Sequence, residues 1–302
     1  MRFDGVLFFP VTAYAADGSV DASLTAEHVA SRLPYRPGGV FAACGTGEFH
    51  ALSAAEVETV VAATVREVAG RVPVVAGAGG PLGHAIECAK RAADAGADAL
   101  LILPPYLVQG PSAGVVAYVD AVLSASGLPA IVYHRASARL DERSVAQLAA
   151  DPRVIGVKDG VGDLGVAQQL VRSVAEAGRT DMAFFNGLPT AELTQQAYRA
   201  IGIPLYSSAA FAMAPRVAAA FYDAYIAGDE TRRLELLDRF YRPLVRLRDE
   251  VPGFAVSLVK AGVRLGGLEV GRVRPPLAEP DERQLDELRR ILAVGDDLVG
   301  TA

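Results

Sequence analysis

The sequence predicts an α/β fold, specifically a (β/α)8 TIM barrel with a C-terminal helical extension. Short apolar runs recur along the first two thirds of the chain, and each is followed by an amphipathic stretch of helical period. The runs are almost continuously apolar, as in parallel strands that are buried on both faces. About eight such units fit the ~250 residues that are typical of a barrel.

The apolar runs define the predicted strands. They begin at Gly5 (GVLFFPVT), Gly39 (GVFAACG), Val72 (VPVVAGAG), Ala99 (ALLILPP), Pro129 (PAIVYHR), Val154 (VIGVKDG), Met182 (MAFFNGL) and Ile203 (IPLYSSA). Between them lie predicted helices, one of which starts with a capping-box pattern at Ser53 and Glu56 and ends at Gly70. A doubly wound open sheet is the alternative, but no GxGxxG motif follows the first strand.

The strand pattern stops near Ala227. Three helical segments follow, DETRRLELLDRFYRPLVRLRDE, FAVSLVKAGVRLGG and DERQLDELRRILAVG. No linker divides the chain, so the sequence predicts a barrel over residues 1–227 that carries the active site. Residues 228–302 are predicted to be an appended helical extension packed on that barrel.

Composition excludes several classes of protein. The 302 residues carry a net charge of -6 without an acidic or basic block, which argues against nucleic acid or an anionic membrane as partner. Cys44 and Cys88 imply no disulfide framework, and we expect both thiols to be inert. The four histidines lack metal-site spacing, so no metal is predicted. Asp4 and Pro10 interrupt the apolar N-terminal run, which favours a cytoplasmic protein over a secreted one.

Lys158 ends the sixth predicted strand, where an apolar residue is expected. In a barrel, side chains alternate between the interior and the helices, and catalytic residues lie at the C-terminal ends of strands. On strict alternation Val154, Gly156 and Lys158 share one face, and Gly156 leaves room for the lysine side chain. The alternatives are a lysine that extends outward to solvent and one that pairs with Asp159.

The fifth strand favours a chemical role for this lysine. Ile131, Tyr133 and Arg135 share a face, whereas His134 falls on the helix-facing side and is interpreted as structural. A lysine in an apolar interior beside a cation has its charged form disfavoured, so more free amine is available at neutral pH. A free amine attacks ketones to give a Schiff base, and a phenol can relay protons. We therefore expect Lys158 and Tyr133 to be catalytic.

Two more strand ends offer substrate contacts. The motif CGTGEF places Gly45 and Gly47 around Thr46, and such a turn lets backbone amides converge on a carboxylate. Its alternative is a turn with no binding role. Ser207 and Ser208 end the eighth strand, where they either contact a polyol chain or satisfy their own backbone.

Taken together and in this order, CGTGEF, YHR and GVKDG resemble the N-acetylneuraminate lyase and dihydrodipicolinate synthase superfamily. The resemblance covers essentially the whole chain, including VRPPL from Val273. The segments FFPVTAY, AGAGG, LLILPPYL, KDGVGD, NGLPTAE and YSSAAF are similar to its branch of dehydratases that act on deoxy-keto-aldarates. Cys44 departs from the glycine expected there, and Gly45 replaces a second threonine of the synthase branch, which disfavours lysine biosynthesis.

The resemblance implies a class I barrel enzyme that forms a Schiff base. Lys158 matches the imine-forming lysine and Tyr133 the proton-relaying tyrosine, while Gly45 and Thr46 lie in the turn that holds the carboxylate next to the ketone.

The resemblance also implies contacts beyond the imine. Tyr106 matches a tyrosine that reaches across a dimer interface in relatives, so a homo-oligomer, dimer or tetramer, is expected. Arg135 and Arg139 are candidates for the distal carboxylate. Gly47 and Gly187 complete the candidate substrate contacts.

The expected reaction is therefore decarboxylating dehydration of a deoxy-keto-glucarate, giving 2,5-dioxopentanoate, water and carbon dioxide in glucarate or galactarate catabolism. The imine is the electron sink, so no cofactor is expected. One alternative is a pyruvate-dependent aldolase, lyase or synthase of the same superfamily, which free pyruvate would reveal. The other is a non-catalytic barrel that binds sugar acids.

Overall fold

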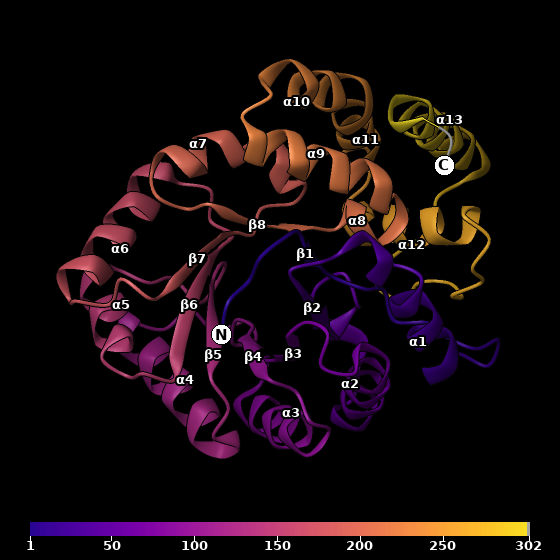
Figure 1. Cartoon of the computed structure of the whole chain (residues 1–302). Helices are drawn as coiled ribbons and strands as arrows, with labels where there is room; N and C mark the ends of the chain where they lie inside the picture. Colours follow the sequence, from indigo (N-terminus) through magenta and orange to yellow (C-terminus); the bar gives the residue numbers. More distant parts are fainter. Residues whose placement is uncertain (301–302) are drawn as a thin grey trace.

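Eight parallel strands close into a barrel in sequence order, and β8 pairs back with β1 (Figure 1). The computed structural model describes residues 1–300. The strands are β1 (Leu7–Phe8), β2 (Gly39–Ala42), β3 (Val74–Ala78), β4 (Ala99–Ile102), β5 (Ala130–His134), β6 (Val154–Asp159), β7 (Ala183–Asn186) and β8 (Leu205–Ser208). The predicted barrel is confirmed. β1 is shorter than its apolar run, which contains Pro10, a residue without an N–H for the strand ladder.

Helices form a ring around the strands (Figure 1). They are α1 (Ala22–Ala30), α2 (Ala54–Val68), α3 (Leu82–Asp94), α4 (Ser112–Ser126), α5 (Glu142–Ala149), α6 (Leu164–Glu176), α7 (Gln195–Ala200), α8 (Ala210–Met213) and α9 (Pro215–Ala227), with short 3₁₀ turns η1 (Leu33–Tyr35), η2 (Phe49–Ala51) and η3 (Ala191–Leu193). The capping box of Ser53 and Glu56 is present, as predicted. The helix ends one residue early, because Ala69 already adopts a left-handed φ of 48° before Gly70.

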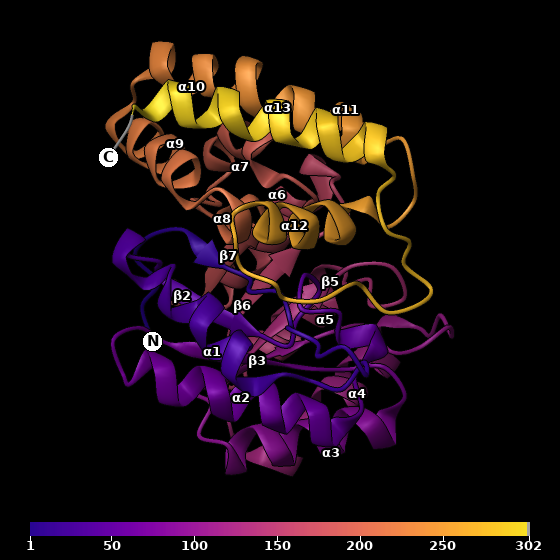
Figure 2. The ribbon, with the colours of Figure 1, turned by 90° about the vertical axis from the view of Figure 1, so that its right-hand side faces the viewer.

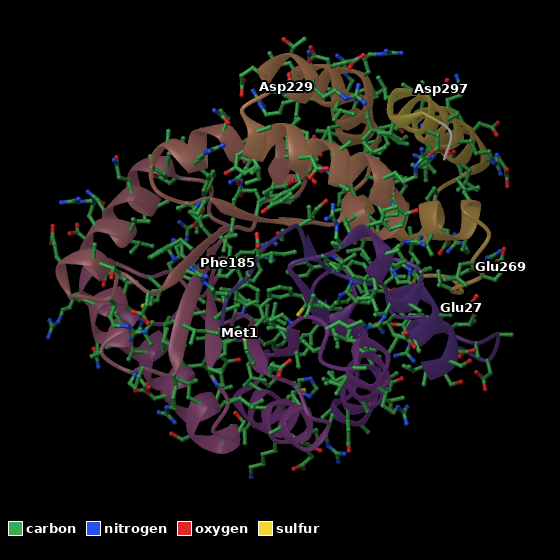
Figure 3. All side chains as sticks on the ribbon, in the orientation of Figure 1. Met1, Glu27, Phe185, Asp229, Glu269 and Asp297 are labelled. Carbon is green, nitrogen blue, oxygen red and sulfur yellow. The ribbon has the colours of Figure 1, made fainter. Side chains whose placement is uncertain are left out.

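Apolar side chains fill the barrel interior, as the sticks of Figure 3 show around the labelled Phe185. Phe9 and Phe41 stack at 4.5 Å between ring centroids in this interior core. Phe3 packs edge-on against Phe185 at 5.4 Å. The interior of the barrel is therefore a packed core.

Strand β6 does not alternate strictly. Ala130 pairs with Val154 but Ile131 pairs with Gly156, so Ile155 is an extra residue in the ladder. Val154 consequently belongs to the helix-facing core, whereas Ile155 packs against the interior core. The prediction that Val154 shares a face with Gly156 and Lys158 is thus wrong for Val154. Beyond the bulge, Gly156 and Lys158 do share a face, as predicted.

The extension contains the three predicted helical segments. They are α10 (Glu230–Leu236) continuing through a π-helical turn η4 (Leu237–Tyr241) into α11 (Arg242–Arg248), then α12 (Phe254–Leu265) and α13 (Glu282–Val299). Pro243, which has no N–H to donate, is the second residue of α11, just after the π-helical turn. Figure 2 shows α10, α11 and α13 together at one end of the molecule, with α12 between α13 and the barrel. Across residues 1–300, no helix has the length and apolar character to cross a membrane.

Candidate active site

A cavity of about 380 Å³ lies where several barrel strands end. In a parallel barrel this is the end at which loops from different strands converge and where catalysis occurs. Barrel residues and residues of the extension together form its walls. The residues that line it include Phe9, Thr46, Tyr133, Arg135, Lys158 and Ser207.

Lys158 lies deep in this cavity with only 6% of its surface exposed. Its Nζ atom is 4.0 Å from the centroid of the Phe9 ring and 4.6 Å from that of Tyr133. Burial lowers the pKa of the Lys158 amine to about 7, and the nearby Arg135 guanidinium also lowers it. A large fraction of this amine is therefore uncharged at neutral pH and able to act as a nucleophile.

Asp159 is not the partner of this amine. The Asp159 carboxylate accepts hydrogen bonds from the backbone N–H groups of Val161 and Gly162, each at 3.2 Å, and from the Tyr198 hydroxyl. The alternative interpretations of Lys158, an outward extension or a pair with Asp159, are both wrong.

Gly187 makes room for the lysine. A Cβ atom at Gly187 would lie 2.5 Å from Lys158 Cε and 2.6 Å from Cγ. A Cβ atom at Gly156 would instead meet the Ala183 carbonyl oxygen at 2.7 Å and the Phe185 ring at 2.9 Å. The predicted role of Gly156 is therefore corrected: it admits a phenyl ring from β7, and the loop after β7 accommodates the lysine.

Tyr133 is paired with Lys158 in the register of β5 and β6. Its hydroxyl donates to the Gly187 carbonyl oxygen at 2.9 Å and accepts from Arg135 Nη1 at 2.9 Å. Burial raises the pKa of the phenol, and the Arg135 guanidinium acts in the opposite direction. The phenol is thus held beside the amine with its hydroxyl between a donor and an acceptor, which suits proton transfer.

The turn after β2 contributes Gly45 and Thr46 to the cavity. Neither the N–H groups of these two residues nor that of Gly47 donates to a backbone carbonyl within residues 1–300. Gly47 itself is not a cavity residue; its carbonyl accepts from Thr12 Oγ1 at 2.7 Å, and a Cβ atom there would lie 3.2 Å from the Pro10 carbonyl oxygen. The turn therefore presents donors suited to an anionic group.

The structure separates the two candidate arginines. Arg135 is exposed and lines the cavity beside Tyr133. Arg139 is also exposed, but it does not line the cavity.

The two candidate serines also separate, because successive residues of a strand face opposite sides. Ser207 lines the cavity and donates to the Asn186 carbonyl oxygen at 3.4 Å. Ser208 is fully buried and donates to Glu192 Oε1 at 2.5 Å, on the helix-facing side.

Tyr106 lies apart from the lysine. It is in the loop after β4 with 64% of its surface exposed, beside the exposed Leu107. It lines a second hollow of about 720 Å³, which adjoins the first because both are lined by Gly45, His50, Tyr133 and Arg135.

Sequence reasoning missed several residues of the cavity wall. His50 lies in η2 and Thr190 in the loop after β7, whereas Val256 and Leu277 belong to the extension. His50 directly follows the CGTGEF motif, and Leu277 ends the VRPPL segment. Nothing in the local pattern of α12 indicates that its first turn faces a barrel cavity.

The remaining polar candidates are structural. His134 Nδ1 accepts from the Leu140 N–H at 2.8 Å on the helix-facing side. Burial raises the pKa of the Cys44 and Cys88 thiols to about 12, so both stay neutral at physiological pH. Residues 1–300 hold no group of three or more histidine, cysteine, aspartate or glutamate side chains arranged to bind a metal ion.

A profile of the dihydrodipicolinate synthetase family matches residues 2–294. The chain belongs to this family. Its relatives include a protein of Streptomyces griseus that is 51% identical over 98% of this chain and 92% of its own length, named "Probable 5-dehydro-4-deoxyglucarate dehydratase". A protein of the same name from Paracidovorax citrulli is 39% identical over 97% of this chain and 95% of its own length. Family membership and these relatives identify the chain as an enzyme of the lyase class.

Solved structures of the family have the same fold. Dihydrodipicolinate synthase from Oceanobacillus iheyensis superposes with a TM-score of 0.87 at 26% identity, covering 97% of this chain and 96% of that chain. The synthase from Bacillus clausii gives 0.86 at 27% identity and covers 96% of each chain.

Proposed function

We propose that this enzyme is a decarboxylating 5-dehydro-4-deoxyglucarate dehydratase that acts through a Schiff base on Lys158. The observation that carries the proposal is a buried amine with a pKa lowered to about 7, in a cavity beside a phenol. The names of relatives that are about half identical over nearly the whole chain supply the substrate. Glucarate or galactarate catabolism is the corresponding metabolic role.

The first step joins the Lys158 amine to the C5 ketone of the substrate and releases water, which leaves an iminium carbon at C5. Tyr133 supplies and accepts the protons of this step, since its ring centroid lies 4.6 Å from the amine nitrogen. The C6 carboxylate, next to the ketone, then accepts from the turn at Gly45 and Thr46, whose N–H groups have no backbone acceptor within residues 1–300.

The imine accepts electrons in both eliminations. Loss of a C4 proton gives an enamine, whose electron pair expels the C3 hydroxyl as water and restores the imine conjugated to a C3–C4 double bond. Cleavage of the C1–C2 bond then releases carbon dioxide, and its electron pair moves through that double bond to the imine nitrogen. Protonation at C4, ketonisation of the C2 enol and hydrolysis give 2,5-dioxopentanoate with one proton consumed, so the chain needs no cofactor.

The far end of the substrate requires a second anion contact. We assign the C1 carboxylate to Arg135, because it lines the cavity whereas Arg139 does not. Ser207 is the corresponding contact for the hydroxyl groups, since Ser208 faces Glu192 instead. Arginine suits this task because its planar fork matches a carboxylate.

The biological setting is proposed in the same way. The enzyme is a homo-oligomer, a dimer or tetramer, in the cytoplasm, with Tyr106 reaching toward a second subunit and with neither nucleic acid nor membrane as partner. Within each subunit, residues 1–227 carry the reacting groups. Residues 228–302 are the extension, whose described residues contribute part of the cavity wall; residues 301–302 lie outside the described residues.

An assay with 5-dehydro-4-deoxyglucarate tests the proposal. We expect equal amounts of carbon dioxide and 2,5-dioxopentanoate, and borohydride added during turnover should leave a reduced adduct on Lys158. Lys158→Met should abolish product and adduct, whereas Lys90→Met, at an exposed position of α3, should retain both. Free pyruvate without carbon dioxide would instead indicate an aldolase, and binding without turnover would indicate a non-catalytic barrel. An adduct on another lysine rejects the assignment of Lys158.

A further inference from the structure

A fully buried ion pair lies behind the turn that carries Gly45 and Thr46. Lys260 of α12 donates from Nζ to Glu48 Oε1 at 2.8 Å, and both side chains have 0% exposure. The second carboxylate oxygen, Glu48 Oε2, accepts from the backbone N–H of Arg274 at 2.7 Å. One carboxylate of the turn therefore binds two separate segments of the extension.

The Tyr14 ring packs against both Lys260 and Arg274. Lys260 Nζ lies 3.7 Å and Arg274 Cζ 4.2 Å from the centroid of the Tyr14 ring. Arg274 also donates to the Ala51 carbonyl oxygen at 2.8 Å and to Glu56 Oε1 at 2.5 Å, on either side of the start of α2. The loop between α12 and α13, which carries Arg274, is thus bound both to the end of η2 and to the first turn of α2.

The turn needs such support because its backbone is unfavourable for the residues that it contains. Glu48 has a left-handed φ of 58° and Ala43 one of 49°. Each such residue costs on the order of 1 kcal/mol, and the conformation persists only where the surroundings hold it. The Glu48 N–H donates to the Gly45 carbonyl at 3.1 Å, so the conformation of Glu48 is linked to the peptide group between Gly45 and Thr46, the two residues of the turn that line the cavity.

We propose that Glu48, held by Lys260 and by the Arg274 N–H, is a positioning residue that fixes the turn of Gly45 and Thr46 for the carboxylate next to the substrate ketone. The inference rests on the proposed function, because it requires a 2-oxo acid bound at Lys158. Glu48 and Lys260 do not line the cavity that contains Lys158, so the pair acts only through the turn. The extension thereby contributes to carboxylate recognition as well as to the cavity wall.

The test uses two small ketones that differ in the carboxylate. Pyruvate has it and hydroxyacetone lacks it, and borohydride trapping on Lys158, read by intact mass, reports imine formation with each. In Lys260→Met the half-saturating concentration of pyruvate should rise about 10-fold or more, as expected when hydrogen bonds to a charged group lose their alignment. Trapping of hydroxyacetone should change by less than about 2-fold.

A second variant and a control make the test decisive. Glu48→Gln keeps the size of the side chain and should show the same selective loss if Lys260→Met does not fold. Arg233→Met removes another buried cation of the extension, paired with Glu230 at 2.6 Å, and should leave both ketones unaffected. Equal losses for both ketones, or unchanged pyruvate trapping in a folded variant, would overturn the inference. Absence of any adduct in the unmodified enzyme would reject the proposed function instead.

Discussion

At the scale of single residues, Lys158 and Tyr133, the proposed catalytic residues, occupy space that glycines leave beside them. Gly187 leaves the space that the Lys158 side chain fills, and Gly160 leaves space for the Tyr133 ring, whose Cε2 atom would lie 2.7 Å from an added Cβ. The Gly187 carbonyl also accepts from the Tyr133 hydroxyl at 2.9 Å. The glycine after β7 therefore sets the positions of both the amine and the phenol.

Substitution of Gly187 by alanine should displace the amine. The added Cβ would lie 2.5 Å from Lys158 Cε and 2.8 Å from the Asp159 carbonyl oxygen, and overpacking of this kind typically costs ~1–3 kcal/mol. We expect the rate of borohydride trapping with pyruvate to fall at least ~100-fold, since a displacement of about 1 Å has such an effect on positioned groups.

Gly83→Ala is the matched control, because an added Cβ there meets no atom within 4 Å. It should trap pyruvate at the rate of the unmodified enzyme. Trapping at that same rate in Gly187→Ala would contradict the steric role of this glycine.

At the scale of elements, the contact between η3 and the π-helical turn η4 encloses an unusual carboxyl group. Glu192 of η3 is 1% exposed, and burial raises its pKa to about 7, although the Ser208 hydroxyl that donates to it acts in the opposite direction. Its Oε2 atom and the hydroxyl groups of Tyr206 and Tyr241 are buried without a hydrogen-bond partner in the described chain. The folded state therefore favours the protonated form of this carboxyl group over the ionised form.

The stability of the enzyme should therefore depend on pH through Glu192. Between pH ~4.5 and ~7 the folded state retains a proton that the unfolded state has lost, so the free energy of unfolding falls as pH rises across this window and stays lower above it. Glu192→Gln keeps an acceptor for the Ser208 hydroxyl but cannot ionise, so it removes the fall in the free energy of unfolding across this window. The variant should gain stability relative to the unmodified enzyme from pH 5 to pH 8, by on the order of 3 kcal/mol at most.

Thermal unfolding at a fixed scan rate, at pH 5 and pH 8, measures this difference. Glu176→Gln, at an exposed position of α6, is the control and should follow the unmodified enzyme at both pH values. A constant difference between Glu192→Gln and the unmodified enzyme would show that Glu192 titrates normally.

At the scale of the whole molecule, the extension and the barrel together line the candidate active-site cavity. The first turn of α12 and Leu277 line the cavity, and Lys260 and Arg274 bind Glu48. The loop after β4 exposes Tyr106, Leu107 and Val108 at 64%, 78% and 70% of their surface, and the first two line the second hollow, which adjoins the cavity. Neighbouring apolar side chains with this exposure are typical of a protein interface.

The proposed oligomer should depend on this loop. Leu107→Asp places a charge in the centre of the apolar segment, and burial of an unpaired charge disfavours association. We expect light scattering to give a mass close to the 31.5 kDa of one chain for this variant and a multiple of it for the unmodified enzyme. Leu234→Asp, at a 44% exposed position of α10, should keep the mass of the unmodified enzyme. Unchanged assembly in Leu107→Asp would place the interface elsewhere.

The sequence by itself determined the features that depend on neighbours along the chain. Periodic apolar runs gave the barrel and the helices of the extension, and the capping box at Ser53 gave the start of α2, because each depends on local geometry. Alternation along β5 predicted that Tyr133 faces the interior. For Lys158 the same argument predicted the right face but wrongly put Val154 on it. The bulge at Ile155 could not be predicted, because it depends on how β5 and β6 pair.

Only the tertiary structure decided how space and charge are shared between distant segments. It placed Arg135 and Ser207, but not Arg139 and Ser208, in the cavity wall. It also assigned the room for the lysine to Gly187 and brought Lys260 to Glu48 across 212 positions of sequence. These relations depend on which side chains meet when strands and loops close around one cavity. A local pattern specifies the direction of a side chain, but packing in three dimensions determines what it contacts.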